Sequence, residues 1–191
     1  MAEIITYPNP LLREKSQPIQ NIQEALSLAQ KLQQTILDKE GRLVGVGLSA
    51  IQIGIPKRIF LAFSKSSRKF LVFVNPQIIW YSKALTSGIP ETKNKYEGCL
   101  SLPNKWAIIR RAKKIKITYQ TLSGQTLTRQ FSGQIATIIQ HEYDHLEGIL
   151  FIDRAKEQGE KIYELAKDEK GKEYLKEINY RAASLPYQQT G

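Results

Sequence analysis

The chemistry of this sequence centres on its only two histidines, His141 and His145, which lie four residues apart. Glu142 directly follows the first of them. In a helix, residues at this spacing lie one above the other on the same face, so the two imidazoles could bind one metal ion. The glutamate could then reach a water at that metal. The alternative is a helix with two ordinary surface or core histidines, but the adjacent glutamate and the lack of other histidines favour the metal site.

A catalytic metal bound by two histidines needs a third protein ligand, because such sites usually combine three protein ligands with one open position. Cys99, the single cysteine, is one candidate, and its alternative role is that of a small buried apolar residue. Glu164 is the other, and it would complete a site like that of the thermolysin-like zinc peptidases. It lies in a segment rich in glutamates. The spacing of the residues leaves both possibilities open.

Three segments together resemble the peptide deformylase family. Gly45–Gln52 is similar to its motif Gly-x-Gly-Leu-Ala-Ala-x-Gln, with Ser49 in place of an alanine. Both residues are small, so we expect this difference to have no consequence. Glu97–Ser101 (Glu-Gly-Cys-Leu-Ser) resembles the second motif and Gln140–Gly148 the third. The order is that of the family, the resemblance spans roughly the first four-fifths of the chain, and three co-linear motifs are more specific than one.

The resemblance implies removal of the N-formyl group from the formylmethionine that begins new polypeptides, with release of formate. It also implies that Cys99, His141 and His145 bind one divalent metal ion. A thiolate with two imidazoles suits several transition metals. The resemblance points to Fe²⁺, with zinc, nickel or cobalt as alternatives in purified protein.

The resemblance further implies three catalytic groups. Glu142 would act as general base toward the attacking water and later pass the proton to the leaving amine. The side-chain amide of Gln52 and the backbone N–H of Leu100 would face the oxygen on which negative charge develops. A glutamine in a loop is usually only solvated, and it is the surrounding motif that singles out Gln52.

Substrate binding and support of the metal ligands are implied for further residues. The substrate would pair as an extra strand with the backbone of Val46, Gly47 and Gly98, and its first side chain would enter a pocket of Ile138, Thr137 and Gln134. The last two are polar for a pocket that accepts a thioether. Asp144 is expected to pair with Arg111, and Glu97 to orient a ligand histidine. The alternative for each is an ordinary surface ion pair.

Length and composition indicate a single domain over residues 1–191, with 41% hydrophobic and 24% charged residues. One cysteine allows no disulfide within the chain, which is typical of a reducing compartment. The sequence has no signal-like start and no apolar run near the ~20 residues of a membrane span. We therefore expect a cytoplasmic protein with no membrane association.

The net charge of +10 is unevenly distributed. No acidic residue occurs between Glu40 and Glu91, or between Glu97 and Glu142. Such an excess favours a polyanionic neighbour such as RNA, and the alternative is a solvated basic face. Ribosome association, through this basic surface or the C-terminal helix, is one possibility, and no direct role on DNA is expected. A non-enzymatic, ribosome-associated module with a purely structural metal is the second hypothesis.

The order of the predicted helices and strands indicates an α+β fold. In this fold, antiparallel strands pack around a central metal-binding helix, with helices at both ends of the chain. Asn21 is the expected N-cap of the first helix, and Ser132 that of the helix carrying the histidines. Strands are predicted at 58–63, 70–74, 77–81, 114–119 and 125–131, a loop at 82–95, and a charged C-terminal helix at 155–181.

Overall fold

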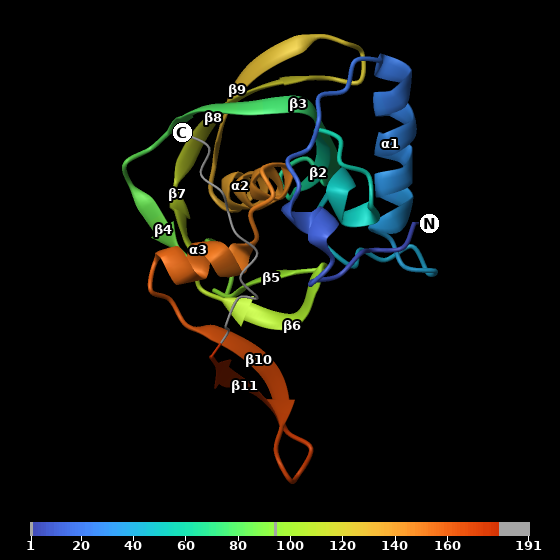
Figure 1. The fold of residues 1–191 in the computed structure, drawn as a ribbon. Coiled ribbons are helices and arrows are strands. Elements are labelled where there is room, and N and C mark those ends of the chain that lie inside the picture. The colour runs from blue at the N-terminus through green and yellow to red at the C-terminus, as the bar shows by residue number, and fades with distance from the viewer. Residues whose placement is uncertain (1, 94, 180–191) are drawn as a thin grey trace.

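The structure, a computed structural model, describes residues 2–93 and 95–179. It confirms the α+β class, with helix α2 (Gln134–Leu146) enclosed by antiparallel strands and helix α1 (Ile22–Thr35) on the periphery (Figure 1). Short 3-10 helices lie at Pro10–Arg13 and Ala50–Ile53. None of the helices in the described residues is long and apolar enough to cross a membrane.

Helix α1 begins where the sequence predicts. The Asn21 side chain accepts a hydrogen bond from the backbone N–H of Gln23, which satisfies one of the free donors of the first turn. Its buried face, which includes Leu28 and Leu32, packs against the core beside strand β2 (Ile59–Ser64). The helix therefore covers one side of the largest sheet.

The largest sheet has the strand order β1-β2-β3-β8-β9. Its strands are β1 (Gly47–Ser49), β2 (Ile59–Ser64), β3 (Lys69–Tyr81), β8 (Lys114–Gln120) and β9 (Thr126–Ser132). The predicted strands are thus confirmed, except that 77–81 continues β3 instead of forming a separate strand. The register of β3 against β8 shifts between Val74 and Gln77, and this irregularity accommodates Pro76 within the strand.

Strand β2 is buried on both faces of this sheet, which explains its almost uniformly apolar sequence. Because side chains alternate along a strand, Ile59 and Leu61 pack in the α1 cluster while Phe60 and Ala62 pack in the cluster that includes α2. The sheet thus gives α2 a rigid apolar base.

The predicted N-cap of α2 is wrong. Ser132 is the last residue of β9, and Gly133 occupies the N-cap position with φ 69° and ψ −150°. Only glycine adopts this conformation readily, because a Cβ would be strained there. The glycine lets the chain pass directly from β9 into the helix, so no side-chain cap is used.

A second sheet lies on the other side of α2, with the order β11-β10-β6-β5. Its strands are β5 (Glu97–Cys99), β6 (Leu102–Ala107), β10 (Ile162–Lys167) and β11 (Glu173–Ile178). A small third sheet pairs β4 (Leu85–Ser87) with β7 (Arg110–Ala112). The segment 82–95, predicted as a loop, therefore contributes a strand.

The predicted C-terminal helix at 155–181 is also wrong, and its residues 180–181 lie outside the described part of the chain. Helix α3 (Phe151–Glu157) ends early, and β10 and β11 form a hairpin that projects from the molecule (Figure 1). Gly159, with φ 66°, follows the end of α3 and breaks the helix there. Gly171, with φ 76°, lies in the turn of the hairpin. Pairing of β10 with the edge of β6 outweighs the local helix propensity of this charged segment.

Candidate active site

Cys99, His141 and His145 form one cluster, with ligand atoms that all lie within 4.8 Å of one another. The cysteine ends strand β5, and both histidines lie on α2. Cys99 Sγ is 3.2 Å from His145 Nε2. Glu164, the alternative third ligand, lies outside this cluster on β10, where it pairs with Lys105 at 3.1 Å.

The two histidines lie in different electrostatic environments. His141 Nδ1 donates a hydrogen bond of 2.6 Å to Glu97 Oε1, which leaves Nε2 free for a metal. Burial opposes the charged form, but the Glu97 carboxylate and the Cys99 thiol raise the pKa of His141 well above its usual value. Burial lowers the pKa of His145 well below the usual value, so that imidazole is neutral and can act as a ligand. One thiol and two imidazole nitrogens fit a divalent transition metal, whose binding would release the proton from Nε2 of His141.

Glu142 follows the first ligand histidine and is almost fully buried, with 3% exposure. Its Oε2 accepts a hydrogen bond of 2.7 Å from the hydroxyl of Ser49. Its Oε1 lies against Gly47, where any Cβ would overlap it. Burial raises the pKa of Glu142 to about 7, although the His141 charge and the Ser49 hydrogen bond oppose this. This pKa suits a general base near neutral pH.

Gln52 lies in the 3-10 helix after β1, and its amide orientation is fixed by the backbone. Its Oε1 accepts a hydrogen bond of 2.8 Å from the N–H of Ser49. Its Nε2 therefore faces the metal cluster, 3.4 Å from Cys99 Sγ and 3.2 Å from Ser101 Oγ. At 2% exposure, Gln52 is not a solvated loop residue.

A cavity of about 500 Å³ opens beside these groups. Its lining includes all of the predicted substrate-binding residues, Val46, Gly47, Gly98, Ile138, Thr137 and Gln134, and also Leu100. Sequence reasoning missed Trp106, which faces Gly98 across the β5–β6 pair and fills the space that a Cβ at Gly98 would need. Alternation along β6 could not have indicated this, because the contact depends on the register of β5 against β6, which shifts between Gly98 and Cys99.

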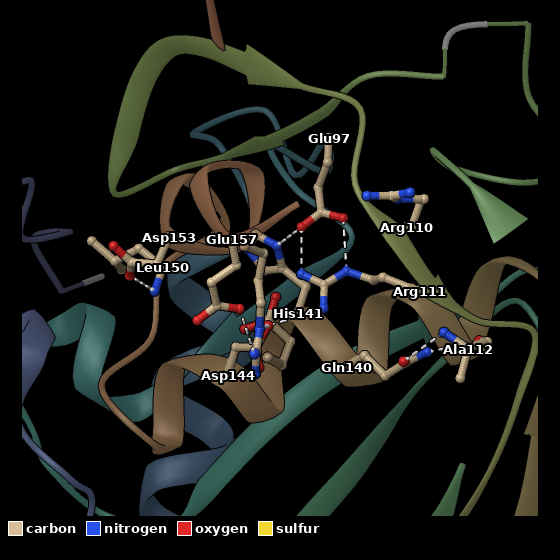
Figure 2. A network of polar contacts seen from close by, with 12 residues as sticks. Glu97, Arg110, Arg111, Ala112, Gln140, His141, Asp144, Leu150, Asp153 and Glu157 are labelled. Carbon is tan, nitrogen blue, oxygen red and sulfur yellow. Dashed lines mark hydrogen bonds and ion pairs between the residues drawn. The ribbon is translucent and has the colours of Figure 1, made fainter. Parts of the chain in front are cut away.

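A buried ion network supports the ligand helix, as Figure 2 shows. Arg111, with 5% exposure, donates to Glu97 at 2.7 and 2.9 Å and to Asp144 at 2.9 Å. Burial of Glu97 would raise its pKa, but Arg111 outweighs this and holds that pKa well below its usual value. Arg154, which the sequence did not single out, donates to Asp144 at 2.7 Å. The predicted contacts of Arg111 and Glu97 are thus present, and they are buried instead of lying on the surface.

The family model described as polypeptide deformylase matches residues 1–161. The chain belongs to this family. Peptide deformylase from Bartonella tribocorum is 38% identical over 159 residues, covering 80% of this chain and 83% of the relative. The enzymes of the family are metal-dependent hydrolases, and the cluster of Cys99, His141 and His145 is a possible metal site of this kind.

Solved deformylase structures share the fold. The crystal structure of peptide deformylase from Thermotoga maritima has a TM-score of 0.69 at 32% identity and covers 81% of this chain and 97% of its own. A Met-Ala-Ser-bound class I type b peptide deformylase from Acinetobacter baumannii has a TM-score of 0.70 at 31% identity, with coverage of 81% and 98%. The hairpin of β10 and β11 follows the part of the chain that the family model matches.

Proposed function

We propose that this chain removes the formyl group from the N-terminal formylmethionine of new polypeptides and releases formate, using one divalent metal ion held by Cys99, His141 and His145. The observation that carries this proposal is the convergence of that ligand cluster, the Glu142 carboxylate and the Gln52 amide nitrogen beside one cavity. We infer Fe²⁺ as the metal in the cell, with zinc, nickel or cobalt as possible occupants of the purified protein.

The bound metal would supply Lewis acidity, which lowers the pKa of water and polarises a carbonyl. The ionised Glu142 carboxylate takes the proton of the attacking water, and the protonated carboxyl then donates it to the leaving amine. Gln52 Nε2 and the Leu100 N–H donate hydrogen bonds to the former formyl oxygen as negative charge develops there. Burial of Gln52 and Glu142 excludes competing water, which strengthens these interactions.

The cavity would bind the substrate by its backbone and first side chain. The peptide pairs with backbone groups of Val46 and Gly47 on one wall and of Gly98 on the other. The first side chain enters the pocket of Ile138, Thr137 and Gln134 on α2. The Met-Ala-Ser peptide in the Acinetobacter baumannii relative supports an N-terminal methionine as the ligand of this cavity.

Product analysis with formyl-Met-Ala-Ser tests the reaction type. We expect formyl-Met-Ala-Ser to yield formate and intact Met-Ala-Ser. The same peptide with an acetyl group in place of the formyl group should not be hydrolysed at a comparable rate. Cleavage of an internal peptide bond instead would support the zinc peptidase alternative. A folded, metal-loaded protein that hydrolyses neither bond would overturn the proposal.

The net charge of +10 supports a second, separate proposal, which is that the chain acts in the cytoplasm at the ribosome surface. Phosphate-rich RNA would attract the basic face, and this attraction would weaken as salt increases. Co-sedimentation with ribosomes at low salt that is lost at high salt is the expected result. Absence of binding at low salt would remove this second proposal and leave the deformylase proposal intact.

A further inference from the structure

Strand β1 brings two of its residues against the Glu142 carboxylate. Gly47 and Ser49 are two residues apart, so they lie on the same face of the strand, and this face is turned toward α2. The hydroxyl of Ser49, fully buried at 0% exposure, lies 2.7 Å from Glu142 Oε2 and 3.0 Å from the backbone oxygen of Glu142. The serine is thus more than a small residue at a place where the family motif has alanine.

We propose that Ser49 is a positioning residue that holds the Glu142 carboxylate in the orientation from which it acts on the attacking water. This inference rests on the proposed function, because it assigns Glu142 the role of general base. It adds a residue to the machinery that neither the motif nor the family match assigns.

The carboxylate is confined on two sides. Ser49 holds Oε2, while Oε1 lies over the bare Cα of Gly47, where a side chain would overlap it. A hydrogen bond to an ionised carboxylate is roughly twice as strong as a neutral one. Rotation of the carboxylate would break this bond and deprive the fully buried Ser49 hydroxyl of this partner. Gly47 and Ser49 together therefore restrict Glu142 to one arrangement beside the cavity.

The hydroxyl also has a second acceptor in the backbone oxygen of Glu142, at 3.0 Å. Since a hydroxyl carries one proton, it donates to one of the two oxygens at a time. With either acceptor, the Ser49 hydroxyl is hydrogen-bonded to Glu142 of α2. The contact joins β1 to the ligand helix as well as orienting the carboxylate.

Substitution of Ser49 by alanine isolates the hydroxyl. The backbone N–H of Ser49, which orients Gln52 through a 2.8 Å hydrogen bond, is unchanged by this substitution. The Ser49 side chain also faces the backbone N–H of Gln52 in a capping box, so comparing Ser49→Ala with and without Glu142 is what separates the two contacts. Ser64→Ala is a matched control, because Ser64 is also a buried strand serine with a hydrogen-bonded hydroxyl, and it lies outside the candidate site.

The first measurement is steady-state formate release by the metal-loaded proteins at equal metal content. We expect Ser49→Ala to lower kcat about tenfold with KM within about twofold of wild type, as loss of one hydrogen bond to a charged group predicts. Ser64→Ala should leave both parameters at wild-type values. An unchanged kcat in Ser49→Ala, with active wild type, would overturn the positioning role and leave the proposed function standing.

The second measurement needs no activity and uses metal-free protein. Urea unfolding of wild type, Ser49→Ala, Glu142→Ala and the double variant forms a double-mutant cycle. We expect Ser49→Ala to lower the folding equilibrium constant about tenfold when Glu142 is present and by a smaller factor when it is alanine, because only the backbone oxygen of residue 142 then remains as an acceptor. Equal effects in both backgrounds would overturn the contact, whether or not wild type releases formate.

Discussion

Glu97 and Glu142 are two buried carboxylates of one site with opposite surroundings. Arg111 holds Glu97 ionised despite its burial, so Glu97 can orient His141 permanently. Glu142 forms no ion pair within the described residues, and burial outweighs the nearby His141 charge to raise its pKa to about 7. Carboxylates whose surroundings separate their pKa values in this way can take different roles in one reaction. These surroundings suit Glu97 to orienting His141 and Glu142 to the proposed role of general base.

The raised pKa of Glu142 predicts a pH dependence of stability in the metal-free protein. Its folded pKa of about 7 lies above the ordinary value of 4.5, so the folded state binds more protons between these two values. Its contribution to stability is therefore lost as pH rises through this window, by up to roughly 3 kcal/mol. Urea unfolding between pH 4.5 and pH 8 should show this loss for wild type and not for Glu142→Gln. Parallel curves for the two proteins would contradict the raised pKa.

The metal ligands can be tested by separate alanine substitutions. Cys99→Ala should bind less than one-tenth of the wild-type metal, because it removes the sulfur ligand of the cluster. Glu164→Ala should retain full metal content, since Glu164 instead pairs with Lys105. Elemental analysis of both variants decides the point. Loss of metal in Glu164→Ala alone would restore the peptidase alternative.

Three sequence motifs predict most residues of the candidate site, because a family motif indicates which side chains lie together in the fold of that family. The motifs therefore predicted the cluster of Cys99, His141 and His145. They did not predict the contact of Ser49 with Glu142, and the serine was expected to have no consequence. That contact joins residues 93 positions apart in the chain, so it depends on how β1 packs against α2.

At the scale of elements, the position of α2 depends on a buried ion network. Arg111 on β7 connects Glu97 on β5 with Asp144 on α2. The arrangement ties the ligand helix to two strands of different sheets. Planar guanidinium geometry allows one side chain to serve both carboxylates.

Arg111→Ala should therefore destabilise the protein by about 3–5 kcal/mol, because it leaves Glu97 and Asp144 as buried charges without this partner. Arg111→Lys should not restore stability, since a single ammonium cannot reproduce the fork of hydrogen bonds. Arg110→Ala, at the exposed neighbouring position, is the control and should change stability by less than about 1 kcal/mol. Thermal unfolding of the three variants measures the differences, and equal losses for Arg110→Ala and Arg111→Ala would refute the network's role.

The hairpin of β10 and β11 covers the edge of β6 and buries Ile162 in the core near α3. Truncation after Lys161 should cost about 2 kcal/mol from loss of this side chain and leave a sheet edge that promotes aggregation. Metal binding should persist, because the ligands lie on β5 and α2. Loss of metal from a folded truncated protein would show that the hairpin supports the site.

The elements show where sequence patterns succeed. Helix α1 has a side-chain cap and helical apolar spacing, β2 is a short apolar run, and β8 and β9 have apolar residues on one face, and all four were predicted. The hairpin was not, because its charged residues also suit a helix and its strand pairing requires the distant edge of β6. Strand β4 was missed for a similar reason. It pairs with β7, and strands β5 and β6 lie between the two in the sequence.

For the whole molecule, composition gives the class of the chain but not the arrangement of its charges. The basic excess of +10 is a property of the sequence, while the candidate active site is built from a few buried acids and histidines with one cysteine. The strands on both sides of α2 (Figure 1) bury Glu142, and the cavity that it lines gives access to it. Chemistry and surface charge are thus separate properties that can be changed independently.

The most direct test of the proposed reaction is formate release from formyl-Met-Ala-Ser by anaerobically purified, iron-loaded wild type beside Glu142→Gln at equal metal content. We expect rapid release by wild type and a loss of at least about a thousandfold in the variant, because the glutamine amide cannot accept the proton of the attacking water. Comparable release by both proteins would contradict the assignment of Glu142 as general base. No release by folded, metal-loaded wild type would contradict the proposed reaction itself.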